Sequence, residues 1–217
     1  MNLQEKAEML AEKTFLGFPS ADFESAGREQ FIYLLTAGLN PDSMLVDIGC
    51  GVLRAGYWLI HFLDVGCYCG IEPHEGRLRM GVDTILEPET LASKLPRFDI
   101  NPHFDTSVFG EKFDFFLAYS IWTHTSKSQL QATLDSFVRD AKDDGVFLAT
   151  YLPVDAENPD YMGEKWNGTS HESDVPGCIH HSLPWIKAEC DRRGLVVQEL
   201  DRDKTYGQSW LEIKRRK

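Results

Sequence analysis

The chain has 217 residues, of which 42% are hydrophobic, enough apolar material for one sizeable core and for a single domain over residues 1–217. Its 22 Lys and Arg against 34 Asp and Glu give a net charge of 22 − 34 = −12. This balance repels phosphate backbones and anionic headgroups, so we expect no nucleic-acid partner and no membrane partner.

The first residues, MNLQEKAEMLAEKTF, contain no long apolar run behind a basic start, and about 18 consecutive apolar residues occur nowhere. We therefore expect a cytoplasmic protein. The five cysteines are scattered, and no second Cys/His cluster with ligand spacing accompanies them. Reduced, mostly buried thiols are the expectation, and no metal site is predicted.

Residues 3–39 carry helical patterns that lead to Gly38, and they predict a helical cap over residues 1–40. After the cap, short apolar runs alternate with helical patterns. The runs predict strands, from their length and their β-branched or aromatic content, at residues 44–48, 67–71, 97–101, 113–119, 146–152, 195–200 and 208–214.

Helical patterns fill most of the gaps between these strands. An apolar stripe over residues 55–63 predicts the first, and residues 76–95 the second. Ser126 and Gln129 form a capping-box pair at the start of a helix that continues to a turn at 143–145. Ser182 and Pro184 begin the last helix, and Gly194 ends it.

This repetition predicts an α/β protein with a doubly wound, mainly parallel sheet, in which ligands bind beyond the carboxyl ends of the strands. The last two predicted strands are separated by only seven residues, 201–207, too few for a parallel crossover. They predict an antiparallel hairpin. Residues 153–181 are rich in Pro, Gly, Asn and Ser without periodicity, and they predict a substrate-covering loop.

The turn after the first strand lies within VDIGCGVLRAG, residues 46–56. Gly49 and Gly51 allow the backbone to approach a ligand at the start of a helix. Arg54 stands where the dinucleotide fingerprint has its third glycine, which disfavours a nicotinamide enzyme.

Two acids identify the ligand further. Asp47, at the end of the first strand, repels a pyrophosphate but can accept hydrogen bonds from an ammonium group. Glu72 ends the second strand, where a carboxylate can accept both hydroxyls of a ribose. A nucleoside that carries an amino acid and no phosphate fits this pattern, and S-adenosylmethionine is such a molecule.

Four segments follow one another in a telling order: VDIGCG at 46–51, GIEP at 70–73, KFDFFLAYSIWTHT at 112–125 and DGVFLATYL at 144–152. In this order and spacing the sequence resembles class I S-adenosylmethionine-dependent methyltransferases. More narrowly, it is similar to a branch of small bacterial methyltransferases with a GCG-x-LR first motif. The resemblance implies a Rossmann-like seven-stranded sheet, ordered 3-2-1-4-5-7-6, with strand 7 antiparallel.

The resemblance also implies cofactor contacts. Asp47, Gly49 and Gly51 would line the methionine part, and Glu72 would bind the ribose. Gln30 lies in FESAGREQ, similar to the segment that closes over the methionine end in relatives. Gln208, in YGQSW, matches a recurrent feature of the branch, but the sequence suggests no physical role for it.

The adenine contact is open among three residues of FDINPHFDTS: Asp99, His103 and Asp105, of which spacing favours His103. NPHF precedes the fourth strand, so it reads as a loop and not as the amino-group-binding turn of adenine or glutamine methyltransferases. Arg54, at a helix start where a cation is disfavoured, predicts a compensating acid or the cofactor carboxylate, and we favour the carboxylate.

The end of the fourth strand, Ser120 to His124, is expected to open onto the cofactor, with Ser120 as a contact. Methyl transfer requires alignment of a nucleophile behind the methyl group and removal of any proton it holds. His124, with an ordinary pKa of ~6.5, is the candidate general base; a helix-capping or packing role is the alternative. The expected acceptor contacts are Trp122, Tyr151, His180 and His181, with Trp166 and His171 as further candidates.

The predicted function is transfer of a methyl group from S-adenosyl-L-methionine to a small-molecule hydroxyl, in a sugar-like or natural-product metabolite, leaving S-adenosyl-L-homocysteine. A hydroxyl is preferred because neither a nitrogen-binding turn nor a basic surface is apparent. A catalytically inactive S-adenosylmethionine-binding or regulatory domain is one alternative. A nicotinamide-dependent oxidoreductase is the other.

Overall fold

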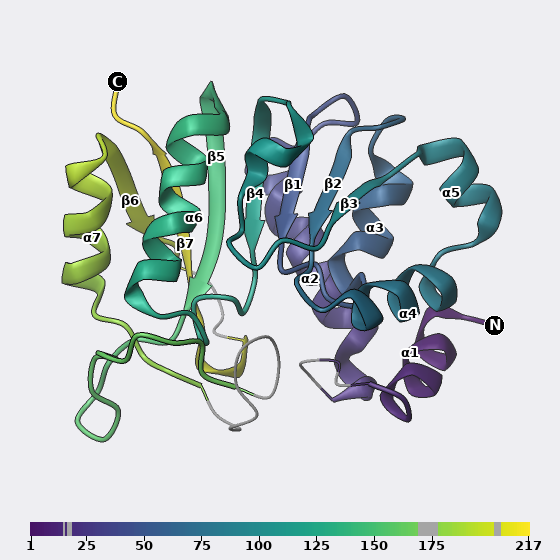
Figure 1. Ribbon diagram of the computed structural model, residues 1–217, viewed down its shortest axis with the longest axis horizontal. Helices are drawn as coiled ribbons and strands as arrows, with labels where there is room; N and C mark the ends of the chain where they lie inside the picture. The colour runs from purple at the N-terminus through teal and green to yellow at the C-terminus, as the bar shows by residue number, and fades with distance from the viewer. Residues whose placement is uncertain (15, 17–18, 169–177, 202–204) are drawn as a thin grey trace. The chain divides into compact units, whose positions relative to one another are not determined.

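The computed structural model describes residues 1–14, 16, 19–168, 178–201 and 205–217 (Figure 1). The seven strands follow the order β3-β2-β1-β4-β5-β7-β6, and β7 is antiparallel to its neighbours. The predicted α/β fold, strand order and antiparallel seventh strand are thus confirmed. The chain forms two compact units, the N-terminal unit Met1–Asn101 and the C-terminal unit Pro102–Lys217, and each is described separately.

The N-terminal unit contains strands β1, β2 and β3, which pair in parallel (Figure 1). The predicted first three strands and the helical N-terminal segment are present. The strands are β1 (Leu45–Ile48), β2 (Tyr68–Ile71) and β3 (Arg97–Asp99). The helices are α1 (Leu3–Ala11), the short 3-10 helix η1 (Ser20–Asp22), α2 (Phe23–Thr36), α3 (Arg54–Phe62), α4 (Glu75–Ile85) and α5 (Pro88–Lys94).

The single helix predicted over residues 76–95 is wrong, because the structure divides it into α4 and α5. Leu86 and Glu87 are extended between them, with ψ of 142° and 145°. The proline ring at Pro88 disfavours helical geometry at the preceding residue, yet its fixed φ suits the first turn of a new helix.

Helix α2 packs tightly against α3 through a glycine. A Cβ atom added at Gly27 would lie 2.3 Å from the carbonyl oxygen of Arg54, so the close approach of the two helices requires glycine there. Nearby, the Phe31 ring stacks on Trp58 at 6.3 Å between centroids and meets Phe62 edge-on at 5.1 Å. The predicted helical cap therefore supports the helix that follows the glycine turn.

The C-terminal unit contains β4 to β7 (Figure 1). Strand β4 is parallel to β5, and β7 pairs antiparallel with both β5 and β6. The predicted terminal hairpin is confirmed. The strands are β4 (Phe113–Ala118), β5 (Ala141–Tyr151), β6 (Leu195–Glu199) and β7 (Ser209–Arg215). The helices are α6 (Lys127–Asp140), α7 (Leu183–Arg192) and the short 3-10 helices η2 (Thr106–Phe109) and η3 (Thr205–Gly207).

The predicted capping box of α6 is confirmed: the Gln129 amide donates to Ser126 Oγ at 3.3 Å, and the Ser126 amide donates to Gln129 Oε1 at 2.9 Å. The predicted turn at 143–145 is wrong. The helix ends at Asp140, and β5 begins at once. Phe113 pairs with Ala141 and Phe115 with Val146, so two steps along β4 (115 − 113) face five along β5 (146 − 141). Residues 142–144 are exposed in this bulge, where their polarity suits water as well as it would suit a turn.

Helix α7 begins after Ser182, although the Ser182 side chain makes no capping hydrogen bond, and Gly194 follows its end with φ of +68°. Aromatic rings fill the core of the C-terminal unit: Phe116 and Phe147 both contact Phe137, at 5.1 and 5.6 Å between centroids. No helix among the described residues has the length and hydropathy needed to cross a membrane.

Candidate functional site

The glycine turn of the N-terminal unit has the backbone geometry that glycine allows. Gly49 and Gly51 have φ of +74° and +56°, in the left-handed region. The Gly49 and Cys50 amides both donate to the carbonyl of Ile71, at 2.7 and 3.0 Å, which fixes the turn to the end of β2. Among the residues that the structure describes, the nearest atom to a Cβ added at Gly51 would be the Gly49 oxygen at 4.0 Å, so these residues leave the turn open above Gly51. This opening permits a ligand to approach the backbone.

Glu72 joins this turn to the turn after β2. One carboxylate oxygen accepts from the Gly51 amide at 3.1 Å, the other accepts from the His74 amide at 3.0 Å, and Arg77 Nη1 lies 3.6 Å away. Only 5% of the residue is exposed. Burial raises the pKa of Glu72, while the Arg77 charge and the two amides oppose the shift. Because a carboxylate has about four lone-pair positions, both oxygens keep capacity for further donors.

Asp47 is the second buried acid of this unit, with 4% of its surface exposed. Its Oδ2 accepts a hydrogen bond from the Tyr68 hydroxyl at 2.9 Å. Burial raises the pKa of Asp47 to about 7; the Tyr68 bond and the Arg54 charge lower it, and Glu72 raises it. A carboxyl group that titrates near neutral pH is poised to lose its proton when a cation approaches.

Arg54 is the first residue of α3, and its positive charge acts on Asp47. Whether this acid or a cofactor carboxylate is the group that compensates the Arg54 charge stays a prediction. Gln30 is buried in α2 and donates from Nε2 to the Ala26 carbonyl at 2.8 Å. Its predicted cofactor contact is likewise untested.

In the C-terminal unit, the turn after β4 is held by side chains from β5 and from the residue before β7. The Ser120 amide donates to Thr150 Oγ1 at 2.7 Å, and the Thr150 hydroxyl donates to Gln208 Oε1 at 2.6 Å. Gln208 Nε2 then donates to Ser120 Oγ at 3.1 Å. Gln208 thus acquires a physical role that the sequence alone did not suggest. Thr150 was missed, because a threonine within a strand carries no motif.

His124 is partly buried beside the segment 166–167. Its Nδ1 lies 2.6 Å from the Asn167 carbonyl oxygen, and its ring stacks on Trp166 at 5.2 Å and 18°. A carbonyl can only accept, so in the neutral imidazole this bond puts the proton on Nδ1 and the lone pair on Nε2. Nε2 faces the Cys178 sulfur at 4.0 Å. This tautomer is the one that a general base acting through Nε2 requires.

His180 and His181 fasten the ends of the long segment. His180 Nδ1 lies 2.6 Å from the Pro153 carbonyl oxygen, and His181 Nε2 lies 3.0 Å from that of Thr125. His181 is fully buried and stacks on Trp185 at 5.9 Å, and burial lowers its pKa. The His180 contact joins the two described ends of residues 153–181, and the His181 contact joins this segment to the turn after β4. The contact of either imidazole with an acceptor stays untested.

Trp122 and Tyr151 pack inside the C-terminal unit. Trp122 has no exposed surface, and its Nε1 donates to Thr133 Oγ1 at 3.1 Å. The Tyr151 hydroxyl donates to Glu199 Oε1 at 3.3 Å, and burial raises its pKa. Their predicted contact with an acceptor stays untested. His171 lies outside the described residues.

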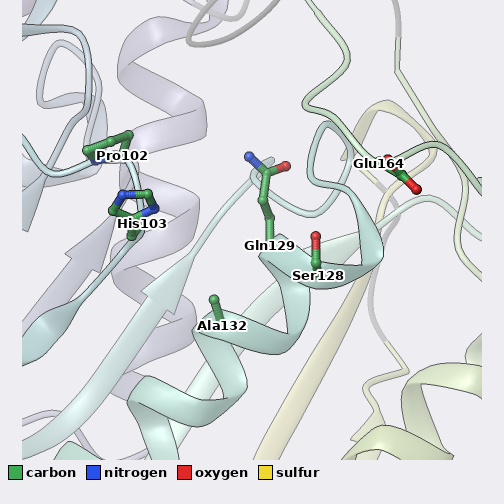
Figure 2. Close-up of a pocket in the computed structure, with 6 residues that line it drawn as sticks. All are labelled: Pro102, His103, Ser128, Gln129, Ala132 and Glu164. Carbon is green, nitrogen blue, oxygen red and sulfur yellow. The ribbon is translucent and has the colours of Figure 1, made fainter.

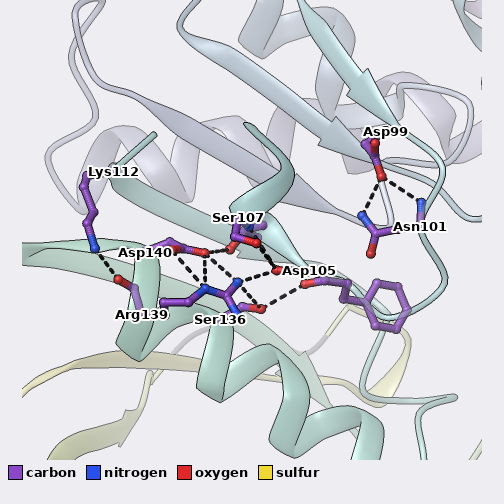
Figure 3. A network of polar contacts seen from close by, with 10 residues as sticks. Asp99, Asn101, Asp105, Ser107, Lys112, Ser136, Arg139 and Asp140 are labelled. Atoms are coloured by element: carbon purple, nitrogen blue, oxygen red, sulfur yellow. Dashed lines mark hydrogen bonds and ion pairs between the residues drawn. The ribbon is translucent and has the colours of Figure 1, made fainter. Parts of the chain in front are cut away.

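His103 is exposed and lines a hollow of about 290 Å³ at the start of α6 (Figure 2). The other lining residues are Pro102, Ser128, Gln129, Ala132 and Glu164. Asp105 accepts from the Ser107 amide and pairs with Arg139, which also pairs with Asp140 (Figure 3).

In the N-terminal unit, Asp99 accepts from the Asn101 amide at 3.0 Å. Of the three adenine candidates, His103 lines the hollow of Figure 2; which of the three contacts adenine stays a prediction. Within the described parts of the chain, no cluster of three or more His, Cys, Asp or Glu could hold a metal ion.

The strand order, with β7 antiparallel in an otherwise parallel arrangement, is that of the class I S-adenosylmethionine-dependent methyltransferase fold. No model of a known protein family matches the sequence. Magnesium protoporphyrin IX methyltransferase (ChlM) from Synechocystis PCC 6803 with bound SAH is similar, with TM-score 0.66, 16% identity, and coverage of 97% of this chain and 93% of that chain.

A S-adenosylmethionine-dependent methyltransferase from Clostridium acetobutylicum ATCC 824 is similar over 100% of both chains, with TM-score 0.66 and 12% identity. The glycopeptide N-methyltransferase MtfA, complexed with S-adenosyl-L-methionine, is similar over 87% of this chain and 93% of its own, with TM-score 0.62 and 12% identity. At these identities the likeness establishes the fold.

Proposed function

We propose that this protein is an S-adenosylmethionine-dependent methyltransferase that acts on a small-molecule acceptor. The observation that carries the proposal is the pair of buried acids, Asp47 and Glu72, on either side of an open glycine turn. Burial of two acids is costly, and a ligand that donates to both offsets that cost. The fold and the small-molecule methyltransferases among the similar structures support the proposal.

The residues of the N-terminal unit fit the cofactor part by part. Glu72, fixed by two backbone amides, has oxygens that can accept the two ribose hydroxyls. Asp47, with a pKa of about 7, can accept from the amino group of the methionine part once ionised. Gly51 leaves room for close approach of that part. When bound, S-adenosylmethionine supplies a methyl group on a positively charged sulfur, ready for displacement.

His124 is assigned the proton transfer. The Asn167 carbonyl holds the Nδ1 proton, so Nε2 can take the proton of an acceptor hydroxyl as that oxygen attacks. Trp166 stacks on the ring and limits its rotation. These contacts hold the imidazole in one orientation and one tautomer, which lowers the cost of organising the base in the transition state.

A hydroxyl on a sugar-like or natural-product molecule is the proposed acceptor. The turn after β4 reads SIWTH and its polar groups bond to one another, so it does not offer the polar groups that grip a target nitrogen. The net charge of −12 disfavours polyanionic acceptors.

Ligand-dependent thermal stabilisation tests the proposal. S-adenosylhomocysteine is expected to bind and to raise the melting temperature, whereas NAD is expected to do neither. A ligand that binds only the folded state, present at 100 times its Kd, adds ~2.7 kcal/mol to the free energy of unfolding. Glu72→Gln keeps the side-chain size but replaces one oxygen with a donor, and is expected to weaken binding by about 10- to 100-fold. Glu75→Gln, at an exposed acid of α4, is the matched control.

The outcomes separate the alternatives. Stabilisation by NAD and not by S-adenosylhomocysteine would replace the proposal with an oxidoreductase. S-adenosylhomocysteine binding without transfer of labelled methyl to any of a panel of sugars and phenols would favour an inactive cofactor-binding domain.

A further inference from the structure

The turn after β4 is closed by a directional ring of hydrogen bonds. The Thr150 hydroxyl gives its one proton to Gln208 Oε1 and receives the Ser120 amide on a lone pair. Gln208 gives an Nε2 proton to Ser120 Oγ. Thr123 Oγ1 donates to the Ser120 carbonyl at 3.0 Å, and the two hydroxyls lie 3.3 Å apart. We call Ser120, Thr150 and Gln208 the β4 clamp.

Each polar atom of the β4 clamp has its own hydrogen-bond partner, and the donor and acceptor assignments agree with one another. Because Thr123 gives its proton to the Ser120 carbonyl, Ser120 Oγ is left to donate to Thr123 Oγ1. Thr150 and Gln208 are buried, Thr150 completely, so water does not readily replace a lost partner. Removal of the Thr150 hydroxyl would take the acceptor from the Ser120 amide and the donor from Gln208 Oε1.

The backbone held by the clamp is in a costly conformation. Ser120 has φ of +60°, in the left-handed region that a residue with a Cβ seldom adopts. From there the chain makes one tight turn in which the His124 and Thr125 amides both donate to the Ile121 carbonyl, at 2.9 and 3.1 Å. The direction of His124 therefore depends on the geometry set at Ser120.

We propose that Thr150 and Gln208 are positioning residues that hold the turn Ser120–His124 in the geometry its proton transfer needs. The inference rests on the proposed function for the role of His124. Thr150 and Gln208 act through Ser120, whose amide donates to Thr150 Oγ1 and whose hydroxyl accepts from Gln208 Nε2. The glutamine of YGQSW and the threonine of LATYL form one unit although 58 residues separate them in sequence.

The test compares Thr150→Val, Thr150→Ser and Gln208→Met with the wild-type protein at a temperature where all are folded. Two readouts need no ligand: hydrogen exchange of the Ser120 amide, and the tautomer of His124 from the ¹⁵N shifts of its ring. In Thr150→Val and Gln208→Met we expect exchange at least ~10-fold faster than wild type and a loss of the single Nδ1–H tautomer. Thr150→Ser restores the hydroxyl and is expected to restore both.

The third readout is transfer of labelled methyl from S-adenosylmethionine to a panel of sugars and phenols. We expect kcat to fall by about 10- to 100-fold in Thr150→Val with KM for cofactor within ~3-fold, since small misplacement of a reacting group costs rate more than binding. The double variant Thr150→Val/Gln208→Met should lose no more than the worse single variant, because both break one ring.

Thr106→Val is the matched control: it also removes a fully buried hydroxyl, which donates to Asp140 at 2.6 Å, outside the turn after β4. It is expected to lose stability while the His124 tautomer stays as in wild type. An unchanged tautomer and amide exchange in Thr150→Val would overturn the inference, as would Thr150→Ser behaving like Thr150→Val. If these two readouts follow expectation but wild type methylates nothing on the panel, only the proposed function fails.

Discussion

In the N-terminal unit the candidate residues Asp47 and Glu72 are buried acids next to backbone amides, a hydroxyl and an arginine. In the C-terminal unit the candidates are hydroxyl, amide and imidazole groups that bond to one another or to backbone carbonyls. The two carboxyl groups of the first arrangement can still accept hydrogen bonds from a ligand. The groups of the second arrangement already bond to one another or to the backbone, and these bonds fix the orientation of the side chains and of the turn.

The difference indicates that the two groups of residues have different roles. Burial raises the pKa of both acids, and a bound cation or donor relieves that penalty. Neutral groups that satisfy one another carry no such penalty, and they hold a turn in place at little electrostatic cost. We therefore expect changes in the N-terminal unit to alter affinity, and changes at the turn after β4 to alter rate.

The largest expected effect is on the rate. His124→Asn keeps a donor at the Nδ1 position for the Asn167 carbonyl but has no basic nitrogen, and we expect kcat to fall by ~10²–10⁴-fold, the usual contribution of a general base. Affinity for S-adenosylhomocysteine, measured by calorimetry, should stay within about 2-fold. His61→Asn is the matched control, since His61 Nδ1 also bonds to a backbone carbonyl, that of Tyr57, but on an exposed helix face. An equal loss in both variants would remove His124 from the mechanism.

Affinity should depend on pH through Asp47. The acid must be ionised to accept from the ammonium group, so with a pKa of about 7 the Kd for S-adenosylhomocysteine should rise as pH falls below 7, by about 10-fold per unit at the limit. Calorimetry from pH 5.5 to 8.5 measures this, and Asp47→Asn should bind weakly at every pH.

The same shift predicts the opposite sign for stability. The folded-state pKa is raised above the ordinary value of 3.8, so the stabilisation from protonated Asp47 is present at low pH and is lost as pH rises through about 7. Asp47→Asn, which can still accept from Tyr68, should then be more stable than wild type at pH 8, by a few kcal/mol at most, since one pKa unit is ~1.4 kcal/mol. A less stable variant at pH 8 would contradict the assigned pKa.

Arg54→Ala separates two roles within the N-terminal unit. The Arg54 charge lowers the pKa of Asp47, so its removal should move the midpoint of the affinity profile to higher pH. If Arg54 also binds the cofactor carboxylate, affinity falls at all pH values, by about 10-fold or more. We expect both effects. A profile that only shifts would leave Arg54 as the partner of Asp47, and identical profiles would exclude both roles.

The smallest expected effect concerns packing of the helix that follows the glycine turn. Gly27→Ala would place a Cβ against the Arg54 carbonyl, and the strain should lower stability by about 1–3 kcal/mol, with a modest loss of affinity. Gly76→Ala in α4 is the control, because there an added Cβ meets only the His74 side chain at 3.3 Å or beyond, and alanine favours helices. Chemical denaturation of both variants measures the difference.

The sequence by itself determined the α/β fold and the antiparallel hairpin at its end, and it singled out Asp47 and Glu72 as candidate ligand-binding acids; the strand order was implied by the resemblance to a known family. Strands buried on both faces read as apolar runs, and the carboxyl end of a parallel strand is where a turn can present Asp47 or Glu72 to a ligand. Local chemistry was sufficient there. Local patterns were misleading at Pro88, where one predicted helix is two, and at 143–145, where polar residues suit an exposed bulge as well as a turn.

Only the tertiary structure decided which polar residues work together. Thr150 and Gln208 meet Ser120 because β5 and β7 pair, and His124 acquires its tautomer from the carbonyl of Asn167, 43 residues away. The tertiary structure also shows that Trp122 and Tyr151, two of the expected acceptor contacts, are packed in the core. Hydrogen bonds depend on distance and angle between atoms, and residue identities along a chain do not specify these until the strands have paired.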